Sequence, residues 1–154
     1  MKVNVIFYHP KNPQNLHDVA TLAATIRADL YVIPRPGVDY KLETLQQKAR
    51  TRLHIVQSME ETVNAIGEAM YVVLETYGTK YLHEVELSRE RIVVVIGAED
   101  YGIPHHVVEA IPEPKAVAKI PTAVQGMSYN VAASLAIALY EVVRGTQSGK
   151  PRNL

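Results

Sequence analysis

The sequence contains no cysteine, and its charges cancel, with sixteen lysine and arginine residues against sixteen aspartate and glutamate residues. Without cysteine the protein has no disulfide framework, no thiolate metal site and no cysteine nucleophile. The balanced charge gives no overall indication of a nucleic-acid partner. Any nucleic-acid surface must therefore be local or assembled from two subunits.

Several functional patterns are also missing. The chain has no GxGxxG, no GxxxxGK[ST] and no G-x-S-x-G pattern. His105 and His106 are adjacent, so their rings cannot share one helical face, and we expect no metal site. The apolar run Val3–Phe7 is too short for a secretory signal, and the apolar stretch that begins at Ser128 is too short for a membrane span. We expect a soluble, cytoplasmic protein with no membrane contact.

The chain has 154 residues, 47% of them hydrophobic, which predicts a single domain over 1–154, with a flexible tail over 145–154. Strand-like runs alternate with helical patterns, which predicts an α/β fold: an open, mostly parallel sheet with helices on both faces. The expected strands are 3–8, 30–33, 53–56, 70–74, 92–96 and 116–120. The expected helices are 16–28, 40–51, 58–67, 107–111 and one that leads into Tyr140-Glu141.

Three segments carry the clearest local signals. Ile92–Ile96 consists of five consecutive β-branched residues, which predicts a strand buried on both faces in the centre of the sheet. Ser58 with Glu61 three residues later is a capping box that starts a helix. Ser128 is expected to cap the last helix, whose alanine, leucine and isoleucine residues predict burial against protein.

The expected ligand site follows from the parallel sheet, because ligands of such sheets bind beyond the carboxyl ends of the central strands. Those ends are the loops at Thr76, Gly97 and Pro121. They are rich in backbone groups, offer acceptors such as Glu99 and Asn130, and carry little positive charge. This favours a neutral or cationic ligand with an adenine and a ribose over a triphosphate.

Two long motifs make the chain similar to a known family. Gly97–Pro104 reads Gly-Ala-Glu-Asp-Tyr-Gly-Ile-Pro and resembles the G-x-E-x-x-G-[IL]-[PS] motif of the SpoU (TrmH-type) branch of the SPOUT RNA methyltransferases. Ile120-Pro121, then Ser128-Tyr129-Asn130 and a helix into Tyr140-Glu141, resembles that family's last motif, I-P-x(6)-S-x-N followed by a helix and Y-E.

A third, partial motif lies upstream. Tyr8-His9-Pro10, with Pro13 and Asn15, is similar to the first motif, P-x-x-P-x-N, of the short, single-domain, TrmL-like members, which methylate the tRNA wobble ribose. The three motifs come in the family's order with matching gaps and cover nearly the whole chain.

The resemblance implies the SPOUT fold, in which the C-terminal segment is threaded as a trefoil knot, an exception to the rule against threading. It implies S-adenosylmethionine bound in a bent shape by the three loops, a homodimer packed through the N- and C-terminal helices, and RNA, either tRNA or rRNA, as substrate. The implied cofactor-binding residues are Leu74, Thr76, Gly78, Gly97, Glu99, Ile120, Met127, Ser128 and Asn130.

The implied roles are specific. Gly97 allows close backbone approach, and Ile120 packs on the adenine. Ser128 and Asn130 donate or accept hydrogen bonds that orient the cofactor and the acceptor nucleotide. With Asn15 of the first motif, these two residues belong to the implied catalytic set.

One departure from the family concerns the mechanism. Family members carry an arginine six residues after the asparagine of the first motif, and here that position is Thr21. Threonine supplies neither the charge nor the bidentate grip of arginine. His17 lies on the same helical face and is a replacement candidate for the base, although a plain surface histidine remains the alternative. His17 and Thr21 complete the candidate catalytic set.

Three functions stay open at this point. The first is an S-adenosylmethionine-dependent RNA methyltransferase, with a ribose 2′-oxygen as the first acceptor and a base nitrogen as the variant that the missing arginine allows. The second is an RNA- or cofactor-binding protein of this fold that has lost catalysis at Thr21. The third is an unrelated α/β enzyme for small molecules. If RNA binds, the candidate phosphate contacts are Arg27, Arg35, Lys41, Lys48, Arg50, Arg52, Arg144, Lys150 and Arg152.

Overall fold

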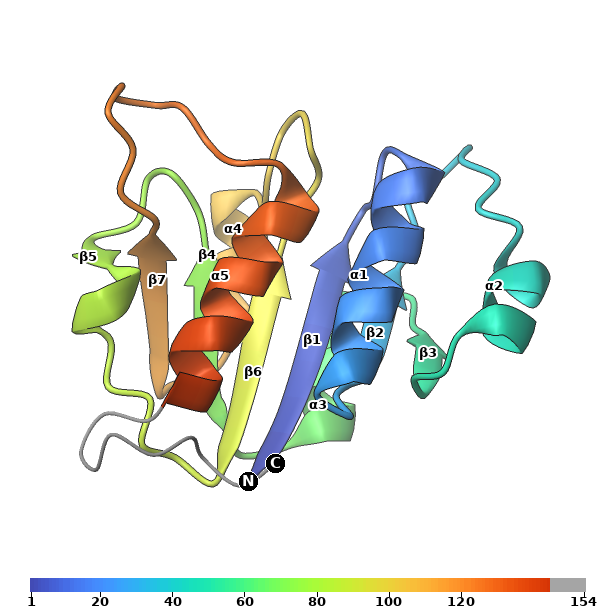
Figure 1. The fold of residues 1–154 in the computed structure, drawn as a ribbon, viewed down its shortest axis with the longest axis horizontal. Helices are drawn as coiled ribbons and strands as arrows, with labels where there is room; N and C mark the ends of the chain where they lie inside the picture. Colours follow the sequence, from blue (N-terminus) through green and yellow to red (C-terminus); the bar gives the residue numbers. More distant parts are fainter. Residues whose placement is uncertain (145–154) are drawn as a thin grey trace.

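A computed structural model describes residues 1–144 and contains a seven-stranded sheet with the strand order β3-β2-β1-β6-β4-β7-β5 (Figure 1). All neighbouring strands are parallel. The predicted open, mostly parallel α/β sheet is confirmed. The expected tail over 145–154 lies outside the described residues. The strands are β1 (Lys2–Tyr8), β2 (Asp29–Ile33), β3 (Leu53–Ile55), β4 (Met70–Leu74), β5 (Lys80–Tyr81), β6 (Arg91–Ile96) and β7 (Lys115–Lys119).

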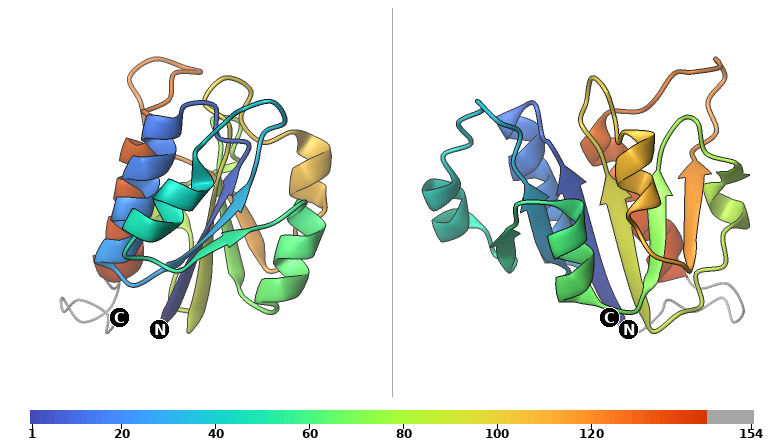
Figure 2. Two further views of the ribbon diagram at one scale, coloured as in Figure 1. Left: turned by 90° about the vertical axis from the view of Figure 1, so that its right-hand side faces the viewer. Right: turned by 180° about the vertical axis from the view of Figure 1, so that it is seen from behind.

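Helices cover both faces of the sheet, as predicted. The N-terminal and C-terminal helices, α1 and α5, lie side by side on one face, and α3 and α4 lie on the other (Figures 1 and 2). Over the described residues, no helix has both the length and the apolarity needed to cross a membrane. The helices are α1 (Pro13–Thr25), α2 (Leu42–Lys48), α3 (Met59–Ile66), η1 (Leu82–Glu84, a 3-10 turn), α4 (His105–Glu109) and α5 (Val131–Arg144).

The central strand is β6, as its β-branched run predicts. It pairs with β1 on one side and β4 on the other. Ile92, Val94 and Ile96 point into the core beneath α1 and α5, whereas Val93 and Val95 point into the core beneath α3 and α4. All five side chains are buried, so the strand joins two hydrophobic cores.

Three helices differ from their predicted ranges by two or more residues, and the last of them, α4, spans His105–Glu109 instead of 107–111. The first begins at Pro13 instead of Leu16, because the side chain of Asn12 accepts a hydrogen bond from the Gln14 amide and caps the helix. The second does not extend over 40–51. Its start is delayed to Leu42, because Lys41 has the left-handed φ of 50°.

One of the two hydrogen bonds of the predicted capping box at α3 is confirmed. The hydroxyl of Ser58 accepts a hydrogen bond from the Glu61 amide at 3.1 Å. The Glu61 carboxylate, however, accepts from the Gln57 amide at 2.7 Å and so bonds one residue further out than predicted. The helix ends before Gly67, whose φ is 81°.

The prediction for the start of the last helix is wrong. Helix α5 begins at Val131, and the Asn130 side chain accepts from the Ala132 amide at 2.9 Å and the Ala133 amide at 3.3 Å. Asn130 therefore occupies the capping position expected for Ser128. The helix is also buried on one side only, and its residues Ala133, Ala136 and Tyr140 are exposed in this chain.

Candidate active site

A cavity of about 960 Å³ lies at the carboxyl ends of β4, β6 and β7. Its walls come from the segments after these strands, which include the motif-two loop (residues 97–104) and the C-terminal loop (residues 121–130). Parts of the chain that are far apart in sequence thus share one cavity. The sequence-predicted site residues that line it are Asn15, Leu74, Thr76, Gly97, Glu99, Ile120, Met127, Ser128 and Asn130.

Three sequence-predicted residues lie elsewhere. Gly78, His17 and Thr21 do not line the cavity. His17 and Thr21 are exposed on α1, and the Thr21 hydroxyl donates a hydrogen bond to the His17 carbonyl oxygen at 3.1 Å. The imidazole of His17 lies 3.9 Å from the Asp18 carboxylate. Neither side chain reaches the cavity of its own chain.

Gly97 and Gly78 are required by the packing of the protein itself. A Cβ atom at Gly97 would lie 2.6 Å from the Ile103 side chain and 2.7 Å from the carbonyl carbon of Gly102. A Cβ atom at Gly78 would lie 2.7 Å from the carbonyl carbon of Ala118. The close approach expected at Gly97 is therefore made within the motif-two loop.

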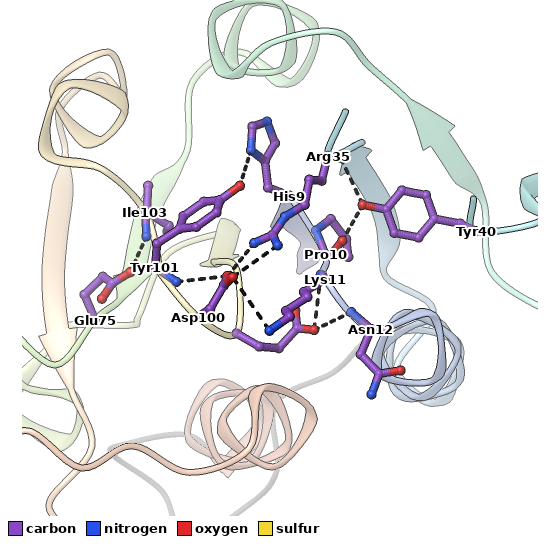
Figure 3. A network of polar contacts seen from close by, with 11 residues as sticks. His9, Pro10, Lys11, Asn12, Arg35, Tyr40, Glu75, Asp100, Tyr101 and Ile103 are labelled. Carbon is purple, nitrogen blue, oxygen red and sulfur yellow. Dashed lines mark hydrogen bonds and ion pairs between the residues drawn. The ribbon is translucent and has the colours of Figure 1, made fainter. Parts of the chain in front are cut away.

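Glu75 lines the cavity between the two predicted residues Leu74 and Thr76, and sequence analysis missed it. Its carboxylate accepts a hydrogen bond from the Ile103 amide at 2.5 Å, which ties β4 to the motif-two loop (Figure 3). Burial raises the pKa of the Glu75 carboxyl, while hydrogen bonds from backbone amides oppose this rise. No local signal marks Glu75, because its partner lies 28 positions away.

Glu99 holds the start of α1. Its carboxylate accepts hydrogen bonds from the Lys11 amide at 3.0 and 3.1 Å and from the Asn12 amide at 2.6 Å. The same carboxylate lines the cavity. Glu99 therefore connects the second motif to the first and has fewer oxygen lone pairs left for a ligand.

Arg35 and Asp100 form the second part of this network. Both terminal guanidinium nitrogens of Arg35 donate to Asp100, and the guanidinium carbon lies 4.4 Å from the centre of the Tyr101 ring. The Tyr101 hydroxyl is 2.7 Å from Nδ1 of His9. The hydrogen bond with Arg35 lowers the pKa of Asp100 to about 2. Arg35, a candidate phosphate contact by sequence, is thus engaged in fixing the motif-two loop.

The first and last motifs meet at one side of the cavity. The amide group of Asn130 donates a hydrogen bond to the Asn15 side-chain oxygen at 3.2 Å, across 115 positions of sequence. The carbonyl oxygen of the Asn130 side chain is used at the same time as the cap of α5. Asn130 is therefore held in a defined orientation by two helices.

Four tyrosines line the cavity and remain partly exposed, with 38–49% of their surface accessible. They are Tyr77, Tyr81, Tyr101 and Tyr129. The hydroxyl of Tyr77 donates to the Ile103 carbonyl oxygen at 2.6 Å, and burial raises the pKa of Tyr77 to about 12. No sequence pattern marks these rings as functional, because a tyrosine outside an apolar run is also an ordinary surface residue.

The cavity fits a ligand of nucleotide size. Its volume is near the upper end of the usual range for small-molecule sites, which is about 300–1,000 Å³. Among the described residues, no group of His, Asp and Glu side chains is arranged to hold a metal ion. The chain is thus an open parallel α/β protein with a cavity at the carboxyl ends of its central strands, the position at which such sheets bind their ligands.

Comparison with known proteins assigns the chain within this class. The model of the SpoU rRNA Methylase family matches residues 2–140, and the chain belongs to this family. It is therefore an RNA methyltransferase that uses S-adenosylmethionine. The third alternative, an unrelated enzyme for small molecules, is excluded.

Individual relatives support the same assignment. A tRNA (cytidine(34)-2′-O)-methyltransferase of Escherichia coli (strain K12) is 26% identical over 97% of this chain and 96% of its own length. A solved structure described for the 2-OH methylation of C/U34 on tRNA is 26% identical, covers 93% of this chain and 95% of that chain, and has a TM-score of 0.77. The SpoU methyltransferase AviRb from Streptomyces viridochromogenes, in complex with AdoMet, shares the fold at 21% identity, over 93% of this chain and 57% of that chain, with a TM-score of 0.77.

Proposed function

We propose that this protein acts in the cytoplasm and transfers the methyl group of S-adenosylmethionine to the ribose 2′-oxygen of a tRNA nucleotide, with nucleotide 34 as the first candidate. The observation that carries the proposal is the meeting of Asn15 and Asn130 at a cavity that all three motif segments line. The E. coli relative, named for 2′-O-methylation of cytidine 34 in tRNA, matches this chain along almost its whole length.

The cofactor residues follow from the cavity lining. Leu74 and Ile120 are partly buried apolar residues beside the core and are suited to pack against an adenine. Thr76, Gly97, Met127 and Ser128 add backbone and side-chain groups along the same walls. Gly78 and Glu99 act in support, because they hold the backbone and α1 in place. When bound, S-adenosylmethionine supplies a methyl group activated by a positively charged sulfur.

Catalysis in this proposal rests on positioning. Asn130 is fixed by α5 and by Asn15, so its amide orients the acceptor ribose for attack on the methyl carbon. The 2′-hydroxyl is a poor nucleophile and must lose its proton during the reaction. Within one chain, His17 and Thr21 lie outside the cavity and cannot supply the base there.

A homodimer would bring these residues to a second cavity. The exposed stripes of α1 and α5 lie on neighbouring helices, with His17 and Thr21 on one stripe and Ala133, Ala136 and Tyr140 on the other. The side chain of Tyr140 is 65% exposed, which favours burial by a partner chain. We extend the proposal to a dimer through these helices and to a knotted C-terminal segment that passes over the motif-two loop.

The decisive experiment is methyl transfer with the purified protein, labelled S-adenosylmethionine and unmodified tRNA transcripts, followed by nuclease digestion and nucleoside analysis. The expected product is a 2′-O-methylated nucleoside at position 34, and Asn130→Ala is expected to abolish it. Label on a base nitrogen would replace the ribose proposal with base methylation. Binding of cofactor and tRNA without transfer would favour the binding-protein alternative, in which Thr21→Arg restores activity.

A further inference from the structure

The outer edge of the cavity carries an aromatic and basic cluster to which neither the motifs nor the comparisons assign a role. Tyr81 of β5 pairs in register with Lys119 of β7, so the two side chains are neighbours. The Nζ atom of Lys119 lies 4.9 Å from the centre of the Tyr81 ring. The ring of His83 in η1 lies 5.6 Å from that of Tyr81 at an angle of 9°. We call Tyr81, His83 and Lys119 the edge cluster.

The edge cluster is held rigidly. The short strand β5 is hydrogen-bonded to β7, and the Tyr81 amide donates to the Glu84 carboxylate at 2.9 Å. The next residue, Leu82, is 3% exposed and anchors η1 in the core. Tyr81 itself remains 40% exposed. A partly exposed ring on a fixed backbone is suited to stacking, since little conformational freedom is lost when a ligand binds.

The charges on the two sides of the cavity differ. On the side of the motif-two loop, Arg35 and Lys11 both lie against the carboxylate of Asp100. At the edge cluster, Lys119 has no carboxylate partner among residues 1–144, and the nearby Glu84 carboxylate accepts from a backbone amide. The cation at this edge, which has no carboxylate partner among these residues, therefore fits an anion such as a phosphate.

We propose that the edge cluster docks a single-stranded nucleotide of the RNA next to the one that is methylated. Its base stacks on the face of the Tyr81 ring opposite the Lys119 ammonium, beside His83, and its phosphate contacts Lys119. Tyr81 and Lys119 line the same cavity as Asn15 and Asn130, so the edge cluster and the proposed acceptor position face one cavity. Aromatic rings beside basic groups are the usual platform for unpaired bases. The proposal rests on the proposed function, because it requires RNA as substrate.

The test compares tRNA binding by Tyr81→Ala, Tyr81→Phe and the wild-type protein, together with cofactor affinity and methyl transfer. Tyr81→Ala is expected to raise the Kd and the KM for tRNA by about 5- to 150-fold, the loss expected for one stacked base, with the Kd for S-adenosylmethionine unchanged. Tyr81→Phe keeps the ring and is expected to behave as wild type. Equal tRNA affinity of the alanine and phenylalanine variants, or a weakened cofactor Kd in Tyr81→Ala, would overturn the proposal.

Lys119 provides a second, independent test that holds if Tyr81→Ala fails to fold. Lys119→Gln is expected to make the negative slope of log K against log salt concentration for tRNA binding shallower by about 0.7, the value for one phosphate contact of a single strand. Lys119→Arg keeps the charge and is expected to keep the wild-type slope. An unchanged slope in Lys119→Gln would contradict the phosphate contact. If the wild-type protein neither binds nor methylates RNA, the proposed function itself fails, and the edge cluster loses its role with it.

Discussion

The motif-two loop and the C-terminal loop line the same cavity, but the chain holds them very differently. Side chains from three other segments, namely Glu75, Arg35 and Lys11, contact the motif-two loop, and Ala98 and Ile103 are buried. All ten residues of the C-terminal loop are exposed. Apart from the bond between Asn130 and Asn15, the hydrogen bonds described for that loop stay within it or reach the start of α5.

This difference indicates that the two loops behave differently when a ligand binds. The motif-two loop is preorganised, so it offers a fixed wall before any ligand arrives. The C-terminal loop has few contacts that would resist movement, and residues with few buried contacts open at low free-energy cost. We therefore expect cofactor binding to order the C-terminal loop while leaving the motif-two loop almost unchanged.

The largest effect is expected from Gly97→Ala in the fixed wall. Its Cβ would collide with the Gly102 backbone, and overpacking of this kind costs about 1–3 kcal/mol of stability. The displaced wall is also expected to abolish methyl transfer. Gly126→Ala is the matched change in the open loop, where nothing lies within 4 Å and the φ of +78° costs about 1 kcal/mol. Urea unfolding measures the stability of both variants, and transfer assays measure their activity. Equal losses of stability and activity in the two variants would contradict the difference between the two loops.

The second largest effect is expected at Glu75. Glu75→Ala leaves the Ile103 amide without its acceptor, which costs about 1–3 kcal/mol, whereas Glu75→Gln keeps an acceptor oxygen and costs less. Because burial raises the pKa of Glu75 in the folded protein, the contribution of this residue to stability is fully present below the ordinary carboxyl pKa of about 4.3 and is lost as pH rises through the raised value. Urea unfolding between pH 4 and 8 should show this fall in the wild type and not in Glu75→Gln.

The third prediction separates Asn130 from Ser128 in the open loop. Asn130→Ala removes the cap of α5 and the bond to Asn15, with an expected loss of about 1 kcal/mol. Ser128→Ala is expected to leave stability unchanged, because no cap depends on it, and to weaken cofactor binding only. Thermal unfolding and calorimetric titration with S-adenosylmethionine measure the two properties separately. A larger stability loss in Ser128→Ala than in Asn130→Ala would contradict the assignment of the cap.

The smallest effect is expected at the ion pair of Arg35 and Asp100, whose side chains are 16% and 39% exposed. Arg35 lowers the pKa of Asp100 to about 2, so this pair contributes stability above the ordinary aspartate pKa of about 3.9 and loses it as pH falls toward 2. Asp100→Asn is expected to lack this acid-dependent loss, and 1 M salt is expected to shrink the difference. Urea unfolding of the wild type and Asp100→Asn between pH 2 and 5 tests this acid-dependent loss of stability, with Asp18→Asn on α1 as the exposed control.

Much of the fold could be predicted because its signals are local. The β-branched run at 92–96 needs no knowledge of its neighbours to indicate a central strand, and the order of strands and helices indicates the parallel sheet. The motif segments likewise placed the cavity at the ends of three strands. At the starts of α1 and α5 the predicted boundaries failed because an asparagine side chain caps the helix, and at α2 because Lys41 takes a left-handed φ.

The remainder depended on contacts that no sequence window contains. Arg35 meets Asp100 across 65 positions, Glu75 meets Ile103 across 28, and Tyr81 meets Lys119 only because β5 adds to the edge of the sheet beside β7. The role of a carboxylate or an aromatic ring cannot be assigned until its neighbours are known. Burial and neighbouring charges set the pKa of a carboxyl group, and packing decides how much of a ring stays accessible. Local patterns in the chain were enough to specify the sheet, the family and the position of the cavity. The side chains that stiffen one wall of the cavity, and those that remain accessible at its edge, depend on the assembled strands, because residues distant in sequence become neighbours only in the folded protein.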